Sequence, residues 1–415
     1  MAKLRVKNFG PIKEGFSEND GFMPIQKLTL FIGAQGSGKS TIAKIYSSFV
    51  WLEKAYFCGF DITKNFVTKD FIQLCSNQLL PEVYFTEKTE LDYIGDYCSF
   101  SFHQENFECK IQNSNEYLRP KIMYMPSERN LVSVLDNVEK IQNLPPMLKL
   151  LQKEISKAKK NYIPKLSENY STLSLDGYSI KYDSKNDTII IIERKSNVAV
   201  PLTNASSGLQ SVVPLLTVTD FLGLETTAPI LDKLKSLSSD EQDVILSAIF
   251  DKNLSKNLKL FFETGLGRNN ITSGIEKYTS SYSRYINSYF INIVEEPEQN
   301  LFPTYQKEIL ESLIIHANLH EKNQLMITTH SPYILGSLNN CIYAGNLTKL
   351  GKDCSSVKSL DEQISFEDVM AYKIENGRIY SIMSDELQLI NNSEIDSCSD
   401  MINAEYQKLE DIELS

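Results

Sequence analysis

The stretch Gly33-Ala34-Gln35-Gly36-Ser37-Gly38-Lys39-Ser40 decides how this sequence is interpreted. The apolar segment 27–32 directly before it predicts a buried strand, and the spacing of apolar residues in 41–56 predicts a helix after it. A glycine-rich turn between a strand and a helix lets backbone N–H groups point at phosphate oxygens, at the positive end of the helix dipole. The sequence therefore predicts a phosphate-binding loop within an α/β fold.

This loop gives roles to individual side chains. We expect Lys39 to reach the β- and γ-phosphates of a nucleotide and Ser40 to ligate Mg²⁺. The positions predicted to bind the nucleotide are Gly33, Gln35, Gly36, Ser37, Gly38, Lys39, Ser40 and Thr41. The alternative is an ordinary glycine-rich turn before a helix, which would not require this spacing together with both flanks.

Glu295 and Glu296 follow the apolar segment 290–294, which predicts another buried strand. In a parallel α/β sheet, the carboxyl ends of the strands lie at the edge that also carries the phosphate loop. We expect Glu295 to hold Mg²⁺, directly or through water, and Glu296 to polarise the water that attacks the γ-phosphate. The alternative is a strand that ends in a solvated acidic turn.

His330 comes shortly after a further predicted strand at 322–328. A histidine in this place can hydrogen-bond a γ-phosphate or the attacking water, so we name Glu296, His330 and Lys39 as candidate catalytic residues. The alternative is a histidine that caps the next helix and takes no part in the reaction.

Ser206 and Gly208 belong to the segment 204–211, which lies between a predicted strand and a predicted helix. Serine and glycine at a helix start create a second anion site from backbone N–H groups and a hydroxyl. Taken alone the segment says little, because many helices begin in this way. Its position in the order of the motifs along the chain is what gives it weight.

The rest of the sequence alternates predicted strands and helices, which is typical of an α/β fold with a mostly parallel central sheet. Strands near 97–112 and a hairpin over 178–200 predict an antiparallel β region. We treat residues 1–415 as one nucleotide-binding domain with helical insertions at 131–170 and 224–285. Further predicted elements are strands at 4–9 and 122–125, a helix near 67–80, a hairpin over 369–380 and an acidic C-terminal helix.

Composition narrows the classes of function. The 415 residues carry 42 Lys plus Arg against 53 Asp plus Glu, which gives a formal net charge of −11. This acidic balance disfavours broad binding to a phosphate backbone, although the lysines of 149–165 offer a local basic patch; the alternative is a solvated helix face. Since no run of about 18 apolar residues and no apolar signal core occurs, we expect a cytoplasmic protein without membrane segments.

Cysteine and histidine usage argues against other metal sites. The 7 cysteines are scattered without a Cys-x-x-Cys pair, which is typical of reduced thiols. His316 and His320 fall on one face of a predicted helix, but no HExxH pattern or third ligand accompanies them. The metal ligands we predict are therefore Ser40 and Glu295, for Mg²⁺.

Four of these segments, 33–40, 204–210, 290–296 and 328–332, follow one another in a known order. They resemble the Walker A loop, signature motif, Walker B strand and switch histidine of ABC-type ATPases of the SMC and overcoming-lysogenization-defect branch. The opening segment 4–11 looks like the first strand of that family.

Other stretches narrow the resemblance further. Segments 124–129 and 295–303 are similar to stretches of bacterial "AAA family" members, which include ATPase subunits of anti-phage systems. The signature departs from the Leu-Ser-Gly-Gly-Gln form, and the glutamine loop is not placed, with Gln104 and Gln73 as alternatives. No long heptad run and no Asp-x-Asp after His330 occur, so we expect neither a coiled-coil arm nor a fused nuclease domain.

The resemblance implies an ATPase that binds ATP with Mg²⁺, hydrolyses it to ADP and phosphate, and forms a head-to-tail homodimer or higher oligomer around ATP. It further implies a sensor or regulator of a partner effector, such as a nuclease or toxin encoded nearby, in antiviral defence. The alternative is a DNA-processing ATPase of recombination or repair, with nucleic acid as a partner. The Glu-Glu-Pro-Glu segment and the insertion at 224–285 disfavour a transporter subunit.

Overall fold

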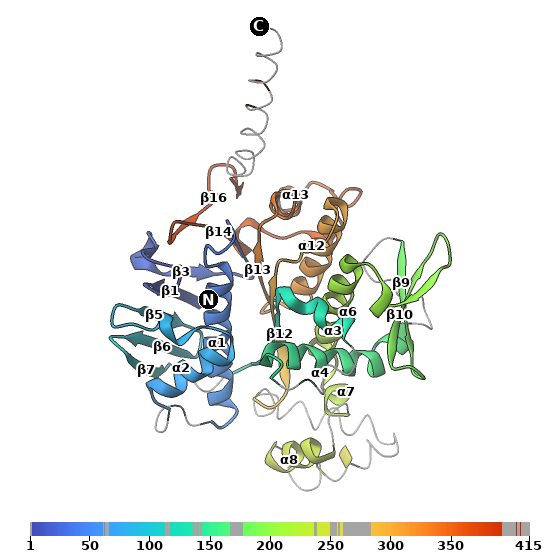
Figure 1. The fold of residues 1–415 in the computed structure, drawn as a ribbon, viewed down its shortest axis with the longest axis horizontal. Helices are drawn as coiled ribbons and strands as arrows, with labels where there is room; N and C mark the ends of the chain where they lie inside the picture. The colour runs from blue at the N-terminus through green and yellow to red at the C-terminus, as the bar shows by residue number, and fades with distance from the viewer. Residues whose placement is uncertain are drawn as a thin grey trace.

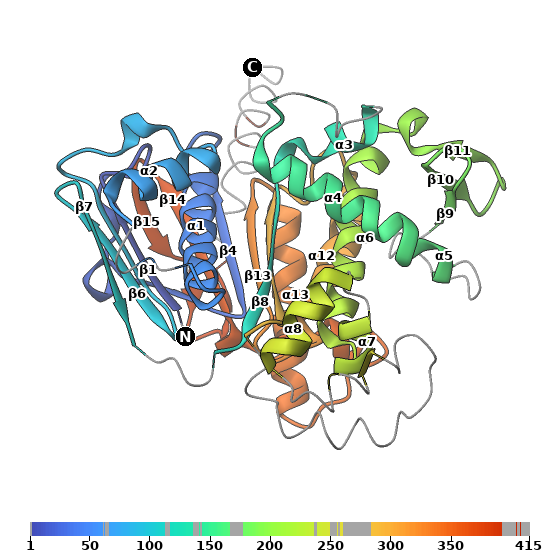
Figure 2. The same ribbon diagram turned by 90° about the horizontal axis from the view of Figure 1, so that it is seen from below.

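The computed structural model describes residues 2–60, 62, 66–112, 117–135, 141, 143–166, 177–235, 239–249 and 284–391, together with residues 255, 258, 259, 404 and 407. A central sheet divides the molecule, with helices on both of its faces (Figures 1 and 2). Its seven strands are, in order across the sheet, β2 (Gly15–Phe16), β15 (Arg378–Ser381), β14 (Val369–Glu375), β4 (Leu28–Gly33), β13 (Gln324–Thr329), β12 (Asn287–Glu295) and β8 (Arg119–Met125). The run from β14 to β8 is parallel throughout, and β15 is antiparallel to β14.

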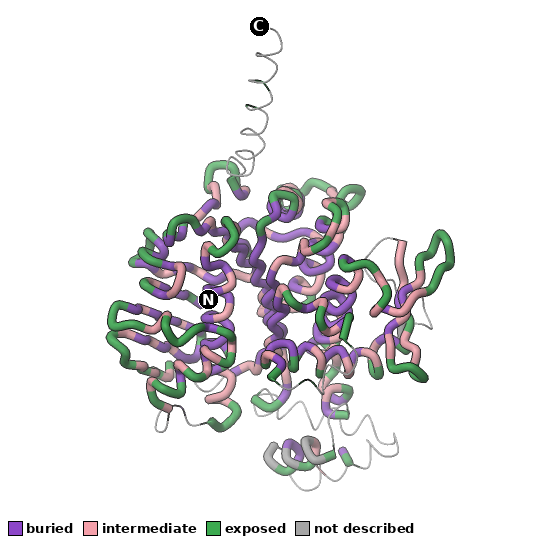
Figure 3. The backbone as a smooth tube through the Cα atoms, in the orientation of Figure 1, coloured by how far each residue is buried: buried purple, intermediate pink, exposed green. Residues whose placement is uncertain are grey.

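Side chains of the central strands alternate between two hydrophobic cores, as the pleat of a strand requires. On β4, Leu28 and Leu30 join the core beneath one face and Phe31 joins the core beneath the other. Strand β12 is buried on both faces, which explains why 290–294 reads as a continuous apolar run. Buried residues accordingly concentrate along the middle of the molecule (Figure 3).

One face of the central sheet is covered by α1 (Lys39–Phe57) and a second sheet. That sheet is antiparallel, with the strand order β3 (Met23–Ile25), β1 (Ala2–Lys7), β5 (Glu90–Ile94), β6 (Cys98–His103) and β7 (Asn106–Ile111). Phe49 on α1 stacks on Phe71 of α2 (Thr68–Asn77) and on Phe100 of β6. This aromatic core fixes α1, and with it the loop that precedes α1.

The other face carries α6 (Ser207–Thr227), α12 (Pro303–Asn318), α13 (Pro332–Lys349) and α4 (Pro146–Asn161). Helix α6 is long and apolar enough to cross a membrane by length and composition, yet 67% of its most apolar window is buried inside the protein. Val212, Leu215 and Leu216 pack in the same core as Phe290 and Val294 of β12. Packing against the central sheet therefore accounts for the apolar character of α6.

Shorter elements complete the described chain. They are α3 (Leu131–Val134), α5 (Ile163–Leu166), α7 (Ile230–Lys235), α8 (Ser239–Ile249), the sheet of β9 (Tyr178–Asp183), β10 (Thr188–Glu193) and β11 (Ala199–Pro201), the pair β16 (Met383–Ser384) and β17 (Leu389–Ile390), and the 3-10 helices η1 (Asn19–Gly21), η2 (Glu82–Tyr84), η3 (Ser127–Asn130), η5 (Leu202–Asn204), η7 (Leu360–Glu362) and η8 (Phe366–Asp368).

The predicted fold class is confirmed: the chain has a P-loop NTPase fold, with a mostly parallel central sheet, an antiparallel β region and helices. The predicted hairpin over 178–200 is present as β9 and β10, with its turn at 184–187. Strand β5 was not predicted, and α6 continues to Thr227, inside the insertion expected at 224–285. The acidic C-terminal helix and most of 250–283 lie outside the described residues, and the division into one domain with two insertions stays a prediction.

Candidate active site

The loop predicted to bind phosphate leaves β4 at Gly33 and enters α1 at Lys39. A Cβ atom at Gly33 would lie 2.4 Å from the carbonyl oxygen of Ile374 on β14, so only glycine fits there. Gly36 has φ 73 and open space where a Cβ would point, while Gly38 has φ 111 and packs against Ile12. No side chain caps α1, so the first N–H groups of that helix are free to meet an anion.

Lys39 is 5% exposed and reaches back over its own loop. Its Nζ donates to the carbonyl oxygens of Gly33 at 2.9 Å and Ala34 at 3.0 Å, and it lies 3.5 Å from Nδ1 of His330. Burial lowers the pKa of Lys39 to about 8, although the carboxylates of Glu296, Glu298 and Glu295 oppose the shift. The ammonium thus faces several carboxylates across the space above the loop.

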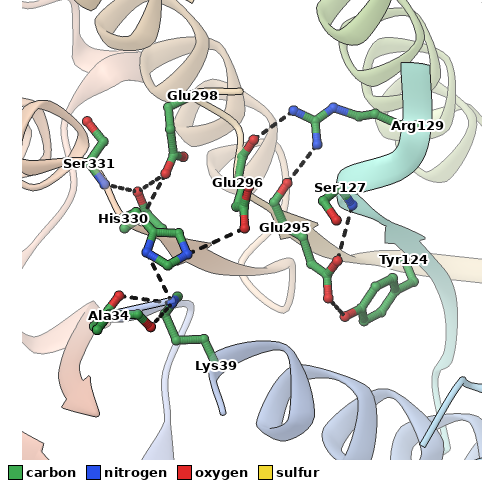
Figure 4. A network of polar contacts seen from close by, with 12 residues as sticks. Ala34, Lys39, Tyr124, Ser127, Arg129, Glu295, Glu296, Glu298, His330 and Ser331 are labelled. Atoms are coloured by element: carbon green, nitrogen blue, oxygen red, sulfur yellow. Dashed lines mark hydrogen bonds and ion pairs between the residues drawn. The ribbon is translucent and has the colours of Figure 1, made fainter. Parts of the chain in front are cut away.

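The two adjacent carboxylates at the end of β12 point in different directions (Figure 4). Glu296 has φ 44, which interrupts the strand, and its Oε1 lies 3.5 Å from Nε2 of His330. Glu295 is 3% exposed and turns away from Lys39. Its carboxylate accepts hydrogen bonds from the hydroxyl of Tyr124 and, at 3.1 Å, from the backbone N–H of Ser127.

His330 is held in place by Glu298. One carboxylate oxygen of Glu298 accepts from Oγ1 of Thr329 and from the backbone N–H of His330, both at 2.7 Å. The cap of α13 is Ser331, whose Oγ accepts from the N–H groups of Tyr333 and Ile334. Ser331 and not His330 therefore caps α13, the ring of His330 lies between Lys39 and Glu296, and its part in the reaction stays a prediction.

Ser206 and Gly208 lie at the start of α6, across the central sheet from α1 (Figure 2). Oγ of Ser206 caps α6 by accepting from Leu209 N–H at 3.5 Å. Gly208 is buried, and a Cβ there would lie 2.7 Å from the carbonyl oxygen of Asn300. Within the part of the chain that the structure describes, no hydrogen bond joins either residue to the phosphate loop, whereas Lys39, Glu296 and His330 come together.

Three residues at the site were not given roles by the sequence reasoning. Tyr124 and Ser127 hold Glu295, and the guanidinium of Arg129 donates to the carbonyl oxygens of Glu295 and Glu296, both at 2.7 Å. Their segment 124–129 was noted for its resemblance alone. Neither alternative for the glutamine loop lies here: Gln73 is on α2, and Gln104 is in the turn between β6 and β7.

Other candidate ligands have internal partners. Nε2 of His316 lies 2.9 Å from Asp220, so its ring is used within the fold. Among the described residues, no group of three or more His, Cys, Asp and Glu side chains is arranged to hold a metal ion. Of the basic residues of α4, Lys157 pairs with Glu154 and Lys159 donates to the carbonyl oxygen of Asp187.

The residues of the loop fit a nucleotide phosphate. Oγ of Ser37 is buried without a hydrogen-bond partner, as is one carboxylate oxygen of Glu298. Buried polar atoms are nearly always paired, so these atoms are suited to a bound group. A Mg²⁺ ion at such a site needs only one or two protein ligands, because phosphate oxygens and water supply the others. Ser40 is at the start of α1, whereas the carboxylate of Glu295 is turned towards Tyr124 and Ser127, so Glu295 would have to exchange those hydrogen bonds to ligate such an ion.

Comparisons with known proteins give a family match to part of the chain and solved structures at a low level of similarity. Residues 230–335 match the AAA ATPase domain family, and this segment contains Glu295, Glu296 and His330. No curated protein matches the chain. Solved structures similar to this chain include the SMC head domain from Thermotoga maritima, at 10% identity over 92% of this chain and 97% of that one, with a TM-score of 0.38.

Two further solved structures are similar at the same low level. One is an Smc head domain with an extended coiled coil, bound to the C-terminal domain of ScpA, derived from Pyrococcus furiosus; it is 9% identical over 97% of this chain and 100% of that one, with a TM-score of 0.40. The other is an ATP-binding cassette of an ABC transporter in its ADP conformation, 12% identical over 94% and 92%, with a TM-score of 0.31. The chain has the P-loop NTPase fold described above, and its residues 230–335 match the AAA ATPase domain family.

Proposed function

We propose that this protein binds ATP with Mg²⁺ and hydrolyses it to ADP and phosphate. The observation that carries the proposal is the convergence of Lys39, Glu296 and His330 from three distant segments onto one space above the phosphate loop. A cation, a carboxylate and an imidazole at the carboxyl edge of a parallel sheet can stabilise the transferring phosphoryl group and orient the attacking water.

Each side chain has a task in that reaction. Lys39 exchanges its two carbonyl acceptors for the β- and γ-phosphates, where its positive charge offsets the charge of the transferring group. Glu296, whose side chain is 35% exposed, orients the attacking water and accepts its proton. Ser40 and Glu295 would hold Mg²⁺, which supplies Lewis-acid polarisation of the phosphates when bound.

We also propose that two copies close around ATP, each lending the start of α6 to the site of the other. Since Ser206 caps α6 on the sheet face opposite α1, it does not complete the site of its own chain. Phe302, just before α12, and Tyr333, three positions after His330, are 69% and 56% exposed. Exposed aromatic residues beside an active site favour a surface that a partner covers.

On the resemblance stated above, we assign the hydrolytic cycle to the control of an effector protein in antiviral defence, in the cytoplasm. Exposed apolar side chains support a protein partner: Leu350, Val357 and Leu360 follow α13 and are 75%, 81% and 68% exposed. The DNA-processing alternative depends on the lysines of α4, of which Lys157 and Lys159 have internal partners. Affinity for DNA that falls steeply with salt would favour that alternative.

Phosphate release from ATP by the purified chain tests the enzymatic part of the proposal. We expect turnover with Mg²⁺ and none with excess EDTA. A folded chain that binds ATP with Mg²⁺ but releases no phosphate would contradict hydrolysis, and one that binds no nucleotide would contradict the site itself.

A further inference from the structure

Arg129, in η3, is a buried cation whose donors are directed at main-chain carbonyl groups. It is 0% exposed, a rare state for an arginine side chain. Its guanidinium donates to four carbonyl oxygens: those of Pro126 at 3.2 Å, Ser211 at 3.1 Å, and Glu295 and Glu296 at 2.7 Å each. Burying a guanidinium is unfavourable unless its donors are satisfied, so these contacts fix its position.

The four acceptors lie in three segments of the chain that meet beside the candidate active site. Pro126 follows β8, Ser211 is in the first turns of α6, and Glu295 ends β12 with Glu296 directly after it. Figure 4 shows Arg129 reaching the backbone of both glutamates from the side opposite His330. One planar side chain therefore ties the start of α6 to the backbone that carries both carboxylates.

The backbone at Glu296 needs this support. Its φ of 44 is unfavourable for a residue with a side chain, and such conformations persist only where their surroundings hold them. The N–H of Glu296 donates to the carbonyl oxygen of Thr328, and its own carbonyl oxygen accepts from Arg129 and from Gln299 N–H. The direction of the Glu296 side chain thus depends on Arg129.

The start of α6 touches the same segment at two further points. Oγ of Ser211 lies 3.3 Å from Oε1 of Gln299, and Gly208 packs against the carbonyl group of Asn300. A rigid-body movement of α6 would therefore press on 299–301, a few positions after Glu296. Arg129 adds hydrogen bonds to these contacts, because its guanidinium donates to the carbonyl oxygens of both Ser211 and Glu296.

A neighbouring hydrogen bond supplies a matched control. Pro214 lacks an N–H group, so the carbonyl oxygen of Gln210, four positions earlier, has no partner within α6. Oγ of Ser133 on α3 donates to it at 2.7 Å. This bond also fastens the start of α6, but it does not involve the backbone of Glu295 or Glu296.

We propose that Arg129 is a positioning residue that couples the start of α6 to Glu296, so that the seating of α6 on a partner's nucleotide sets the hydrolytic carboxylate of its own chain. The coupling rests on the proposed ATP-sandwich function. The connection through Arg129 exists in the nucleotide-free chain and can be tested there separately.

The first measurement is amide hydrogen exchange of the nucleotide-free chain. Arg129→Lys keeps the charge but loses the planar fork, so exchange should rise in both 207–213 and 295–301. Ser133→Ala should raise exchange in 207–213 alone. Unchanged protection of 295–301 in a folded Arg129→Lys chain would overturn the connection whether or not the protein hydrolyses ATP. If that variant does not fold, Arg129→Gln replaces it, with the same expected and contradicting results.

The second measurement separates kcat from ATP affinity. The phosphate loop makes no contact with Arg129 among the described residues, so ATP affinity should be unchanged while kcat falls on the order of 10²-fold. Ser133→Ala should lower kcat much less than Arg129→Lys does, because it leaves the hydrogen bonds to the backbone of Glu295 and Glu296 in place. A kcat equal to the native value in folded Arg129→Lys would overturn the coupling, whereas an inactive native chain would count against the proposed function instead.

Discussion

Nζ of Lys39 lies 3.5 Å from Nδ1 of His330, although 291 positions separate the two residues in the sequence. A lysine ammonium can only donate, so this contact requires the tautomer of His330 in which Nδ1 is unprotonated, and in that tautomer the N–H of Nε2 faces Glu296. The ring thus connects the phosphate-binding cation to the carboxylate that we assign to water. The residue that we expect to bind the phosphates therefore lies next to the residues that we expect to act in hydrolysis, all in one chain.

Lys39→Ala should abolish productive ATP binding, because within the described part of the chain no other lysine or arginine is bonded to the phosphate loop. Burial lowers the pKa of Lys39 to about 8, and phosphate charge should raise it again. ATP binding near pH 8 should therefore take up a proton, which calorimetry in buffers of different ionisation enthalpy measures. Lys44→Ala, on the same helix, is the charge-matched control. If folded Lys39→Ala bound ATP with the affinity of the native chain, the assignment of 33–40 as the phosphate-binding loop would be wrong.

Glu295→Gln should raise the Mg²⁺ concentration needed for ATP binding by about 10–100-fold, because an amide is a poor ligand for a hard cation. The substitution also disturbs the hydrogen bond from Tyr124. Tyr124→Phe is the control, since it removes that hydrogen bond and keeps the carboxylate. A Mg²⁺ requirement that rises equally in both variants would mean that Glu295 is structural.

Ser206 should act on the nucleotide of the partner chain. Ser206→Asp keeps a good helix cap but adds a negative charge towards phosphate, and Ser206→Asn is the neutral control. Neither Ser206→Asp nor Lys39→Ala should hydrolyse ATP alone, but mixed dimers contain one intact composite site and should recover activity. Gly208 is unsuitable for this test, because any side chain there would meet Asn300. Mixed dimers that form and stay inactive would refute the trans arrangement.

The pair of His316 and Asp220 should make stability depend on pH. Burial lowers the pKa of His316, but the hydrogen bond and charge of Asp220 outweigh it, and the net shift is upward. The folded state therefore binds the proton more tightly, so the stabilisation is complete below the unfolded pKa of about 6.5 and is lost as pH rises through the folded value.

Asp220→Asn should consequently lower the free energy of unfolding by about 1.5–3 kcal/mol near pH 6 and by less near pH 9. The hydroxyl of Tyr162 donates to the same carboxylate at 3.1 Å. Tyr162→Phe removes that neutral donor and should destabilise the fold similarly at both pH values. Thermal unfolding of the two variants compares them, and equal losses for Asp220→Asn at both pH values would contradict the assignment.

Much of the fold around the candidate site was accessible from the sequence, because local patterns encode it. Glycine spacing between a strand and a helix identified 33–40, and apolar runs located β12 and β13. Strand β5 was missed although Glu90-Leu91-Asp92-Tyr93 alternates, because the strand is only 5 residues long and Glu and Asp are depleted in strands. Strand ends differ by a few residues, as expected where the ends of elements lack sequence signals.

Three-dimensional relations at the site were not accessible in this way. The sequence cannot tell that φ 44 at Glu296 turns neighbouring carboxylates apart, so Glu295 faces Tyr124 and Ser127. Arg129 binds main-chain carbonyl groups, which every residue carries, so its partners leave no pattern of side chains. The glutamine loop stays unplaced, since Gln73 is on α2 and Gln104 is in the turn between β6 and β7.

The central claim is that Glu296 activates the water that attacks ATP, and a comparison of the native chain with Glu296→Gln tests it most directly. The amide keeps the shape of the side chain but does not accept a proton, so single-turnover hydrolysis should fall on the order of 10²–10⁴-fold. ATP affinity should persist, and ATP should hold the variant as a dimer on sizing chromatography. Hydrolysis by folded Glu296→Gln at the native rate would contradict the claim.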